Sequence, residues 1–159
     1  MILVLLGTQN NSFYRLLEEV EKNIKNGVIK EEVIVQAGHT KFESEKMKIF
    51  DLIPGDELEK LQDEARVIIT HGGVGSIISS LKKNKKVIAI PRKVEFKEHV
   101  NDHQIQIVKR FSDDGYIIGL EDVKYLENAL EGIDHFYPKK YKANNKKMLN
   151  IIETFIDGL

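Results

Sequence analysis

The sequence has 159 residues, of which 42% are hydrophobic and 31% are charged, a composition that predicts one globular domain. The net charge of −1 at neutral pH gives no electrostatic reason to expect nucleic acid as a partner. The absence of cysteine excludes disulfides and thiolate chemistry and is consistent with a cytoplasmic protein, and no apolar run approaches the roughly 20 residues of a membrane-spanning helix.

Short apolar runs of strand character alternate with segments of helical periodicity. The N-terminal run is too short to span a membrane and lacks the basic flank of a signal peptide, so it is predicted to be the first strand. Apolar residues at i, i+3 and i+4 spacing predict the helices. The predicted strands cover residues 2–6, 32–36, 48–53, 67–70, 87–90 and 116–118, and the predicted helices cover residues 13–24, 56–65, 76–83, 101–110 and 121–130.

Two of these helices carry signals at their N-termini. Asp56 is followed three residues later by Glu59, which is the spacing of a capping box. Asn101 and Asp102 precede a helical segment, and the side chain of either can cap it.

Strands and helices that alternate with short connections predict an α/β fold, a Rossmann-like parallel sheet with helices on both faces. The strands are nearly continuous runs of Val, Ile and Leu, as in a sheet that is buried on both faces. Ligands of such sheets bind beyond the carboxyl ends of the strands. We therefore expect the segments that follow Leu6, Thr70 and Ile90 to converge on one site.

The chain is predicted to divide into an α/β domain over residues 1–137 and a basic linker with an amphipathic helix over residues 138–159. This helix either folds back on the domain or docks a partner, with its lysines near an anionic membrane surface. The lysines are Lys139, Lys140, Lys142, Lys146 and Lys147, and the apolar stripe comprises Met148, Leu149, Ile151, Ile152, Phe155, Ile156 and Leu159.

A glycine-rich turn follows the strand predicted at 67–70. It reads His71, Gly72, Gly73, Val74, Gly75 and Ser76, and it leads directly into a helix. Glycines let the backbone approach a ligand closely, and unpaired N–H groups at a helix start favour an anion such as a phosphate. Gly7 and Thr8 form a weaker signal of the same kind after the first strand. The alternatives are a tight turn with a packed His71 and, for Gly7 and Thr8, an ordinary strand-to-helix turn.

Polar side chains are concentrated just after the strand predicted at 87–90. A carboxylate such as Glu98 can accept two hydrogen bonds from the diol of a ribose. Arg92, and less specifically the neighbouring lysines, can offer charge to a diphosphate. His99 and His103 are four residues apart, but no third ligand accompanies them, so no metal is expected. The polar cluster comprises Glu98, His99, Asn101, Asp102, His103 and Gln104, and together with the glycine turn it predicts a site for a nucleotide sugar.

Together these motifs resemble the donor-binding, C-terminal half of GT-B glycosyltransferases. The likeness covers nearly the whole chain and is strongest to the small catalytic subunits of two-component UDP-sugar transferases. This group includes the enzyme that adds the second N-acetylglucosamine to dolichol diphosphate and transferases of bacterial capsule and exopolysaccharide synthesis. It depends on Gly7-Thr8 with Phe13-Tyr14-Arg15-Leu16, Gln36-Ala37-Gly38, the His71–Ser76 turn, Pro91-Arg92, and the run from Glu98 to Gln104.

The resemblance assigns roles to these residues. It implies diphosphate contacts from Gly7, Thr8 and the His71–Ser76 turn. It implies a ribose contact from Glu98, and contacts of Asp102, His103 and Gln104 with the donor sugar or its phosphates. His71 would stabilise the leaving group, and the base would come from a partner. Val74 and Lys97 depart from the usual pattern, which puts the loop geometry in question.

The resemblance also predicts how the chain works. It implies a cytoplasmic subunit, peripheral to the membrane through a membrane-anchored, acceptor-binding partner, that transfers a hexosyl or N-acetylhexosaminyl group from a UDP-sugar to a lipid-linked saccharide with inversion. No cofactor is expected. Two alternatives remain: a non-catalytic subunit that binds a nucleotide sugar for regulation, and a self-contained nucleotide-sugar epimerase, for which a second domain is missing.

Overall fold

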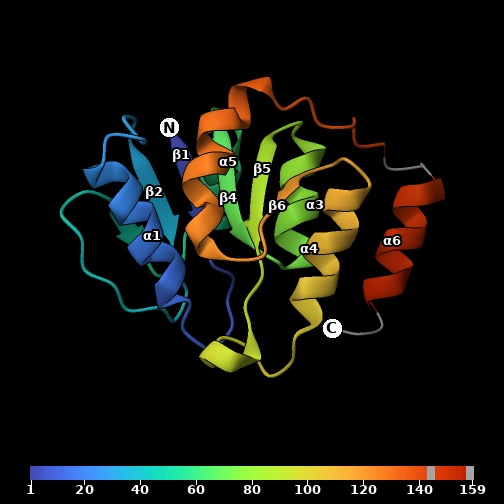
Figure 1. The fold of residues 1–159 in the computed structure, drawn as a ribbon, viewed down its shortest axis with the longest axis horizontal. Coiled ribbons are helices and arrows are strands. Elements are labelled where there is room, and N and C mark those ends of the chain that lie inside the picture. Colours follow the sequence, from blue (N-terminus) through green and yellow to red (C-terminus); the bar gives the residue numbers. More distant parts are fainter. Residues whose placement is uncertain (143–145, 157–159) are drawn as a thin grey trace.

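A computed structural model describes residues 1–142 and 146–156. Within these ranges the strands form one sheet, and every neighbouring pair in it is parallel (Figure 1). The strand order is β3-β2-β1-β4-β5-β6, so the first strand lies inside the sheet. The strands are β1 (Ile2–Leu5), β2 (Val33–Gln36), β3 (Lys48–Phe50), β4 (Val67–His71), β5 (Lys86–Ile90) and β6 (Ile118–Gly119).

Helices cover both faces of the sheet, which confirms the predicted α/β class. On one face, α1 and α5 pack on the sheet, and α3 and α4 pack on the other, with α6 outside α4 (Figure 1). The helices are α1 (Tyr14–Lys25), α2 (Gly55–Glu64), α3 (Val74–Lys82), α4 (His103–Asp113), α5 (Leu126–Gly132) and α6 (Lys146–Ile156), with short 3-10 turns η1 (Val94–Phe96), η2 (Val123–Tyr125) and η3 (Ile133–His135).

The apolar sequence of β1 explains how one strand supports two cores. Successive side chains of a strand point to opposite faces. Ile2, Val4 and Leu6 therefore join the core under α1 and α5, whereas Leu3 and Leu5 join the core under α3 and α4. All five are almost completely buried, so β1 anchors both layers.

The C-terminal helix folds back on the domain in the part that is described. Met148 and Ile151 are buried in the same core as residues of α3 and α4, and Ile152 packs at its margin. Leu149 is 45% exposed. The side chains of Phe155 and Ile156, and Leu159 as a whole, were predicted to extend this apolar stripe and lie outside the described residues.

The strand register gathers the carboxyl ends of the central strands at one edge. Leu5 is level with Gln36 on one side and with Thr70 on the other, and His71 is level with Ile90. The chain runs outward from β1 to β3 and then returns to place β4 on the other side of β1, which makes the edge between β1 and β4 the switch point. The predicted convergence of the segments after Leu6, Thr70 and Ile90 is confirmed.

Three helix starts differ from the sequence-based predictions. The capping role predicted for Asp56 is wrong, because Pro54 occupies the N-cap position and Asp56 lies within the first turn of α2. The helix predicted at 121–130 begins with η2, because Asp122 accepts a hydrogen bond from the N–H of Lys124 at 3.0 Å and closes a separate turn. Asp102 occupies the N-cap position of α4, but its Oδ1 binds the N–H of Val94 at 2.9 Å and makes no cap.

Two strands also end differently. The strand predicted at 48–53 ends at Phe50. Beyond it, Ile53 donates its N–H to Oε1 of Gln36 at 2.8 Å, and the chain turns toward α2. The strand predicted at 116–118 is displaced along the chain, because β6 pairs through Ile118 and Gly119 and not through Tyr116.

None of the helices in the two described ranges combines the length and the apolar character that crossing a bilayer requires.

Candidate nucleotide-sugar site

His71 lies at the centre of the carboxyl edge, enclosed by two glycines. Gly7 has φ of +79°, and a Cβ atom placed on it would lie 2.7 Å from Cε1 and Nε2 of the His71 ring. A Cβ on Gly73 would lie 2.4 Å from Cε1 of the same ring. The glycines at these two positions are therefore required for the ring to fit, and they bring the loop after β1 and the turn after β4 to the same side chain.

The ring of His71 is held neutral by its surroundings. Burial is the main cause that lowers its pKa to about 3, and the nearby positive charge of Arg92 acts in the same direction, whereas the hydrogen bond from Gln104 opposes the shift. The Nε2 atom lies 3.4 Å from the hydroxyl of Ser76, in the first turn of α3. The ring can therefore exchange hydrogen bonds with a ligand there without carrying charge.

The N-terminus of α3 offers N–H groups to a ligand. The first N–H groups of a helix have no partner within it, and in the described part of the chain no side chain caps α3. The first helical bond runs from the N–H of Ile77 to the carbonyl of Gly73 at 3.1 Å. Gly72 differs, because its N–H already donates to Oε1 of Gln104 at 3.0 Å. The N–H groups of Val74, Gly75 and Ser76 are thus the donors suited to an anion.

Arg92 lies inside the protein, and its guanidinium binds three backbone carbonyls. Nη1 donates to the carbonyls of Asn11 at 2.7 Å and Glu98 at 3.0 Å, and Nη2 donates to that of Leu6. Burial lowers the pKa of Arg92 to about 10, partly offset by Glu98. The charge predicted to meet a diphosphate is therefore positioned behind the loops of the site, where it fastens them to one another.

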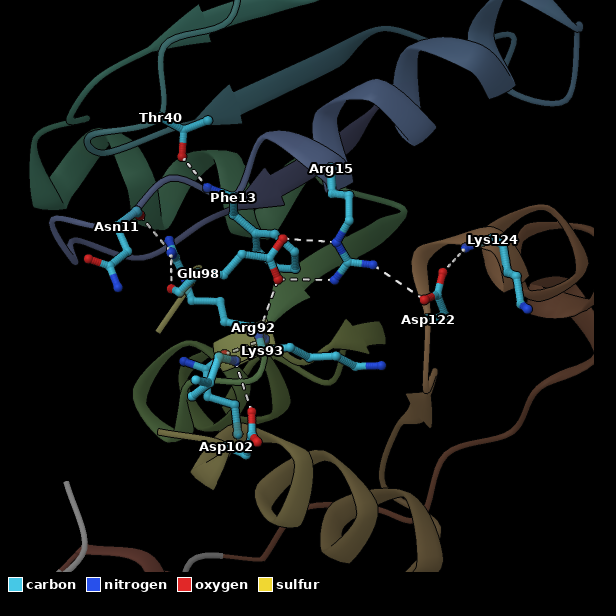
Figure 2. Close-up of polar contacts among 12 residues, drawn as sticks. Asn11, Phe13, Arg15, Thr40, Arg92, Lys93, Glu98, Asp102, Asp122 and Lys124 are labelled. Atoms are coloured by element: carbon cyan, nitrogen blue, oxygen red, sulfur yellow. Dashed lines mark hydrogen bonds and ion pairs between the residues drawn. The ribbon is translucent and has the colours of Figure 1, made fainter. Parts of the chain in front are cut away.

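Glu98 is also enclosed, with 4% of its side chain exposed. Figure 2 shows its carboxylate facing the guanidinium of Arg15, which comes from α1. Nε of Arg15 lies 2.9 Å from Oε2, Nη2 lies 3.0 Å from Oε1, and the N–H of Lys93 donates to Oε1 at 3.1 Å. Nη1 of Arg15 reaches Oδ2 of Asp122 at 3.4 Å, just before η2. Protein donors thus bind both oxygens of Glu98 in this structure. The ribose contact predicted for Glu98 stays a prediction.

Other residues of the predicted polar cluster lie in the loop between η1 and α4. His99 is half-buried, and its Nε2 lies 2.6 Å from the side-chain amide of Gln9. Burial, followed by the charge of Arg92, lowers the pKa of His99. Asn101 and Asp102 are exposed and brace the loop by accepting hydrogen bonds from the N–H groups of His103 and Val94. Thr8 is exposed beside Gly7.

Gln104 is the member of the cluster that contacts His71 directly. Its Nε2 lies 3.1 Å from Nδ1 of the ring. The structure therefore joins the two strongest sequence motifs, the glycine turn and the run from Glu98 to Gln104, through this pair. In the described ranges, no group of three His, Cys, Asp or Glu side chains is placed to hold a metal ion.

Arg15 is the site-forming residue that the sequence-based prediction did not include among the site residues. The available signal was an arginine between the apolar residues Phe13 and Leu16, at the start of a predicted helix. Its guanidinium lies 4.0 Å from the ring centroid of Phe96 in η1, as well as binding Glu98. It thus joins α1 to the loop that carries the polar cluster.

Comparison with known proteins gives one family and several structural relatives. A family model described as the glycosyltransferase family 28 C-terminal domain matches residues 1–157. No curated protein matches the sequence. The NMR solution structure of ALG13 is similar, with 19% identity and a TM-score of 0.59 over 94% of this chain and 92% of that one.

Two larger enzymes share the fold over part of their length. The crystal structure of the glycosyltransferase of kitacinnamycin matches with 15% identity and a TM-score of 0.57, over 82% of this chain and 34% of that one. The glycosyltransferase SnogD from Streptomyces nogalater matches with 13% identity and a TM-score of 0.54, over 96% of this chain and 37% of that one. The chain thus spans about a third of these two enzymes, and identities this low establish the shared fold alone.

Proposed function

Because this chain belongs to the glycosyltransferase family 28 C-terminal domain family, we propose that it is the donor-binding subunit of a UDP-sugar glycosyltransferase. The observation that supports this most directly is the arrangement at the N-terminus of α3. A neutral His71, the Ser76 hydroxyl and the first N–H groups of the helix lie together at the switch point of the sheet. Such donors suit a diphosphate.

In the proposed reaction, the hydroxyl of an acceptor saccharide attacks the anomeric carbon of the donor sugar. The bond from that carbon to the β-phosphate oxygen breaks, UDP leaves with the bonding electrons, and the configuration inverts. The proton of the acceptor hydroxyl passes to a base that the partner supplies. The part of this chain is to hold the diphosphate and to stabilise the charge that develops on it, through the N–H groups of Val74, Gly75 and Ser76 and the ring of His71.

We propose further that the acceptor is a lipid-linked saccharide presented by a membrane-anchored partner. The proposal is supported by the resemblance to the small subunits of two-component transferases. It also agrees with the match to ALG13, which covers nearly the full length of both chains. The loop between η1 and α4, in which Asn101 and Asp102 are exposed, would then border the nucleotide and the transferred sugar.

Calorimetric titration tests the donor site directly. UDP, UDP-glucose, UDP-galactose and UDP-N-acetylglucosamine are titrated into the purified chain, and into the complex with a co-expressed partner encoded beside it. Ser76→Ala should weaken UDP binding about tenfold, because it removes one hydrogen bond to a charged group. Ser79→Ala is the matched control, one turn along α3, and should bind like the wild type.

The expected result is binding of UDP and of one of the three UDP-sugars, followed by transfer of that sugar when the partner and a lipid-linked saccharide are added. Absence of binding by both the chain and the complex would contradict the donor-site assignment. Binding without transfer by the complex would favour a regulatory subunit.

A further inference from the structure

The amide of Gln104 has only one orientation that satisfies its neighbours. Oε1 lies 3.0 Å from the backbone nitrogen of Gly72 and 3.1 Å from that of Arg92. Both nitrogens carry a hydrogen and can only donate, so the atom that faces them must be the amide oxygen. The NH2 group is consequently directed at Nδ1 of His71, at 3.1 Å.

This orientation determines which nitrogen of His71 carries the proton. An NH2 group only donates, so Nδ1 must accept and has no hydrogen. The ring is buried and neutral, so its single proton then resides on Nε2. Nε2 is the ring nitrogen that lies 3.4 Å from the hydroxyl of Ser76, in the first turn of α3.

The backbone around Gln104 fixes the side chain in this place. Gln104 lies in the first turn of α4 and is 3% exposed. Gly72 follows β4, and a Cβ atom on it would lie 2.8 Å from Cβ of Gln104, so α4 packs directly on the turn. Arg92 follows β5, the strand next to β4. One side chain therefore spans the exits of two adjacent strands and ends on His71.

We propose that Gln104 is a positioning residue that holds His71 in its Nε2–H tautomer, so that the ring donates a hydrogen bond to the leaving diphosphate. The proposal depends on the function proposed above for the placement of the diphosphate. It assigns to Gln104 an effect that acts through His71, in place of the direct contact with the donor that the family resemblance implies. It also means that His71 in this state presents no lone pair toward the ligand and does not act there as a base.

The Gln104→Glu substitution keeps the size and shape of the side chain but replaces the donor that faces Nδ1 of His71 with an acceptor. A carboxylate accepts the same two backbone N–H groups, but it can only accept from Nδ1 as well. In the neutral ring the single proton then resides on Nδ1, and Nε2 presents a lone pair to the diphosphate. Gln104→Met provides a neutral second variant of similar volume, which removes the tautomer constraint without adding charge.

The tautomer is read from long-range ¹H–¹⁵N spectra of protein labelled in its histidine rings, without ligand. We expect the wild type to show Nε2–H at His71 and Gln104→Glu to show Nδ1–H. Nδ1–H in the wild type, or no change in the Glu variant, would overturn the proposal. Because this readout needs no ligand, it is independent of the donor-site assignment, which fails separately if the wild type binds no UDP.

Binding then tests the consequence. UDP affinity should fall about tenfold or more in both variants, which corresponds to one lost hydrogen bond to a charged group. Uridine, which has no phosphate, should bind all three proteins equally. A variant whose tautomer has changed but whose UDP affinity is that of the wild type would refute the donor role of Nε2.

Discussion

Arg15 and Glu98 are separated by 83 residues in the sequence and form a two-point ion pair, with Nε 2.9 Å from Oε2 and Nη2 3.0 Å from Oε1. Their side chains are 19% and 4% exposed. The pair connects α1 to the loop between β5 and α4, as Figure 2 shows. The shape of the polar cluster therefore depends on a contact between two distant parts of the chain.

We expect Arg15 and Glu98 to be energetically coupled. Removing Glu98 alone leaves a partly buried guanidinium without its main partner, so Glu98→Ala should lower the free energy of unfolding by about 3 kcal/mol. A double-mutant cycle with Arg15→Met, measured by urea unfolding, should give a coupling energy of about 1–3 kcal/mol. The exposed pair Lys48 and Glu32 is the control and should give about 0.5 kcal/mol or less. Additive effects at Arg15 and Glu98 would contradict the coupling.

Gly75 is expected to matter for the ligand and not for the fold. A Cβ atom on it meets nothing within 4 Å, so Gly75→Ala should leave the free energy of unfolding unchanged or raise it by up to about 1 kcal/mol. The added methyl group stands where a diphosphate would approach α3, and UDP affinity should fall about tenfold or more. Gly132→Ala in α5 is equally unobstructed and should leave affinity unchanged. Equal affinities of the two variants would place the diphosphate elsewhere.

His71 should make the protein less stable in acid. Its pKa is about 3 in the folded protein and near 6.5 when the chain is unfolded, so the unfolded state binds the proton first. The contribution of His71 is complete above about pH 6.5 and is lost as the pH falls toward 3, with a slope of at most about 1.4 kcal/mol per pH unit. Unfolding free energies measured between pH 4 and 7 should therefore change less in His71→Gln than in the wild type. Identical slopes would show that the ring is not held neutral.

Arg92 is expected to be structural, and lysine should not replace it. A lysine cannot reproduce the planar fork that reaches three carbonyls, so carbonyls of Leu6, Asn11 or Glu98 would lose their donors. Arg92→Lys should lower the free energy of unfolding by about 2–4 kcal/mol, as followed by thermal or urea unfolding. Arg110→Lys, at a partly exposed pair with Asp114, is the control and should cost less than about 1 kcal/mol. A wild-type stability in Arg92→Lys would show that the carbonyls find other donors.

The fold could be predicted because a parallel sheet buried on both faces constrains each strand strongly. Runs such as residues 67–70 must be apolar on both sides, and this requirement is visible without any knowledge of the partners. The ends of elements were less predictable, because they depend on local competition for hydrogen bonds. Asp102 illustrates this, since its carboxylate binds the N–H of Val94, eight residues earlier, and not its own helix.

The convergence of the motifs on one site could be predicted, but the hydrogen bonds between their side chains could not. The glycine turn and the polar cluster were expected to converge, and Gln104 joins them. Arg15 binds Glu98, 83 residues away, and Arg92 binds the carbonyl of Leu6, 86 residues away, and no local pattern specifies these partners. An arginine after a strand and a proline resembles a surface residue until three carbonyls from two separate loops are known to surround it.

The position of β1 inside the sheet has a consequence for folding during synthesis. β1 leaves the ribosome before β4, and its pairing with β4 has to wait until β4 has been made. Until then, apolar side chains on both faces and one row of backbone hydrogen-bonding groups of β1 lack their native cover. Pairings between segments so far apart in sequence form slowly, and exposed strand edges aggregate. Nascent chains that stall before β4 should therefore be the species that chaperones bind.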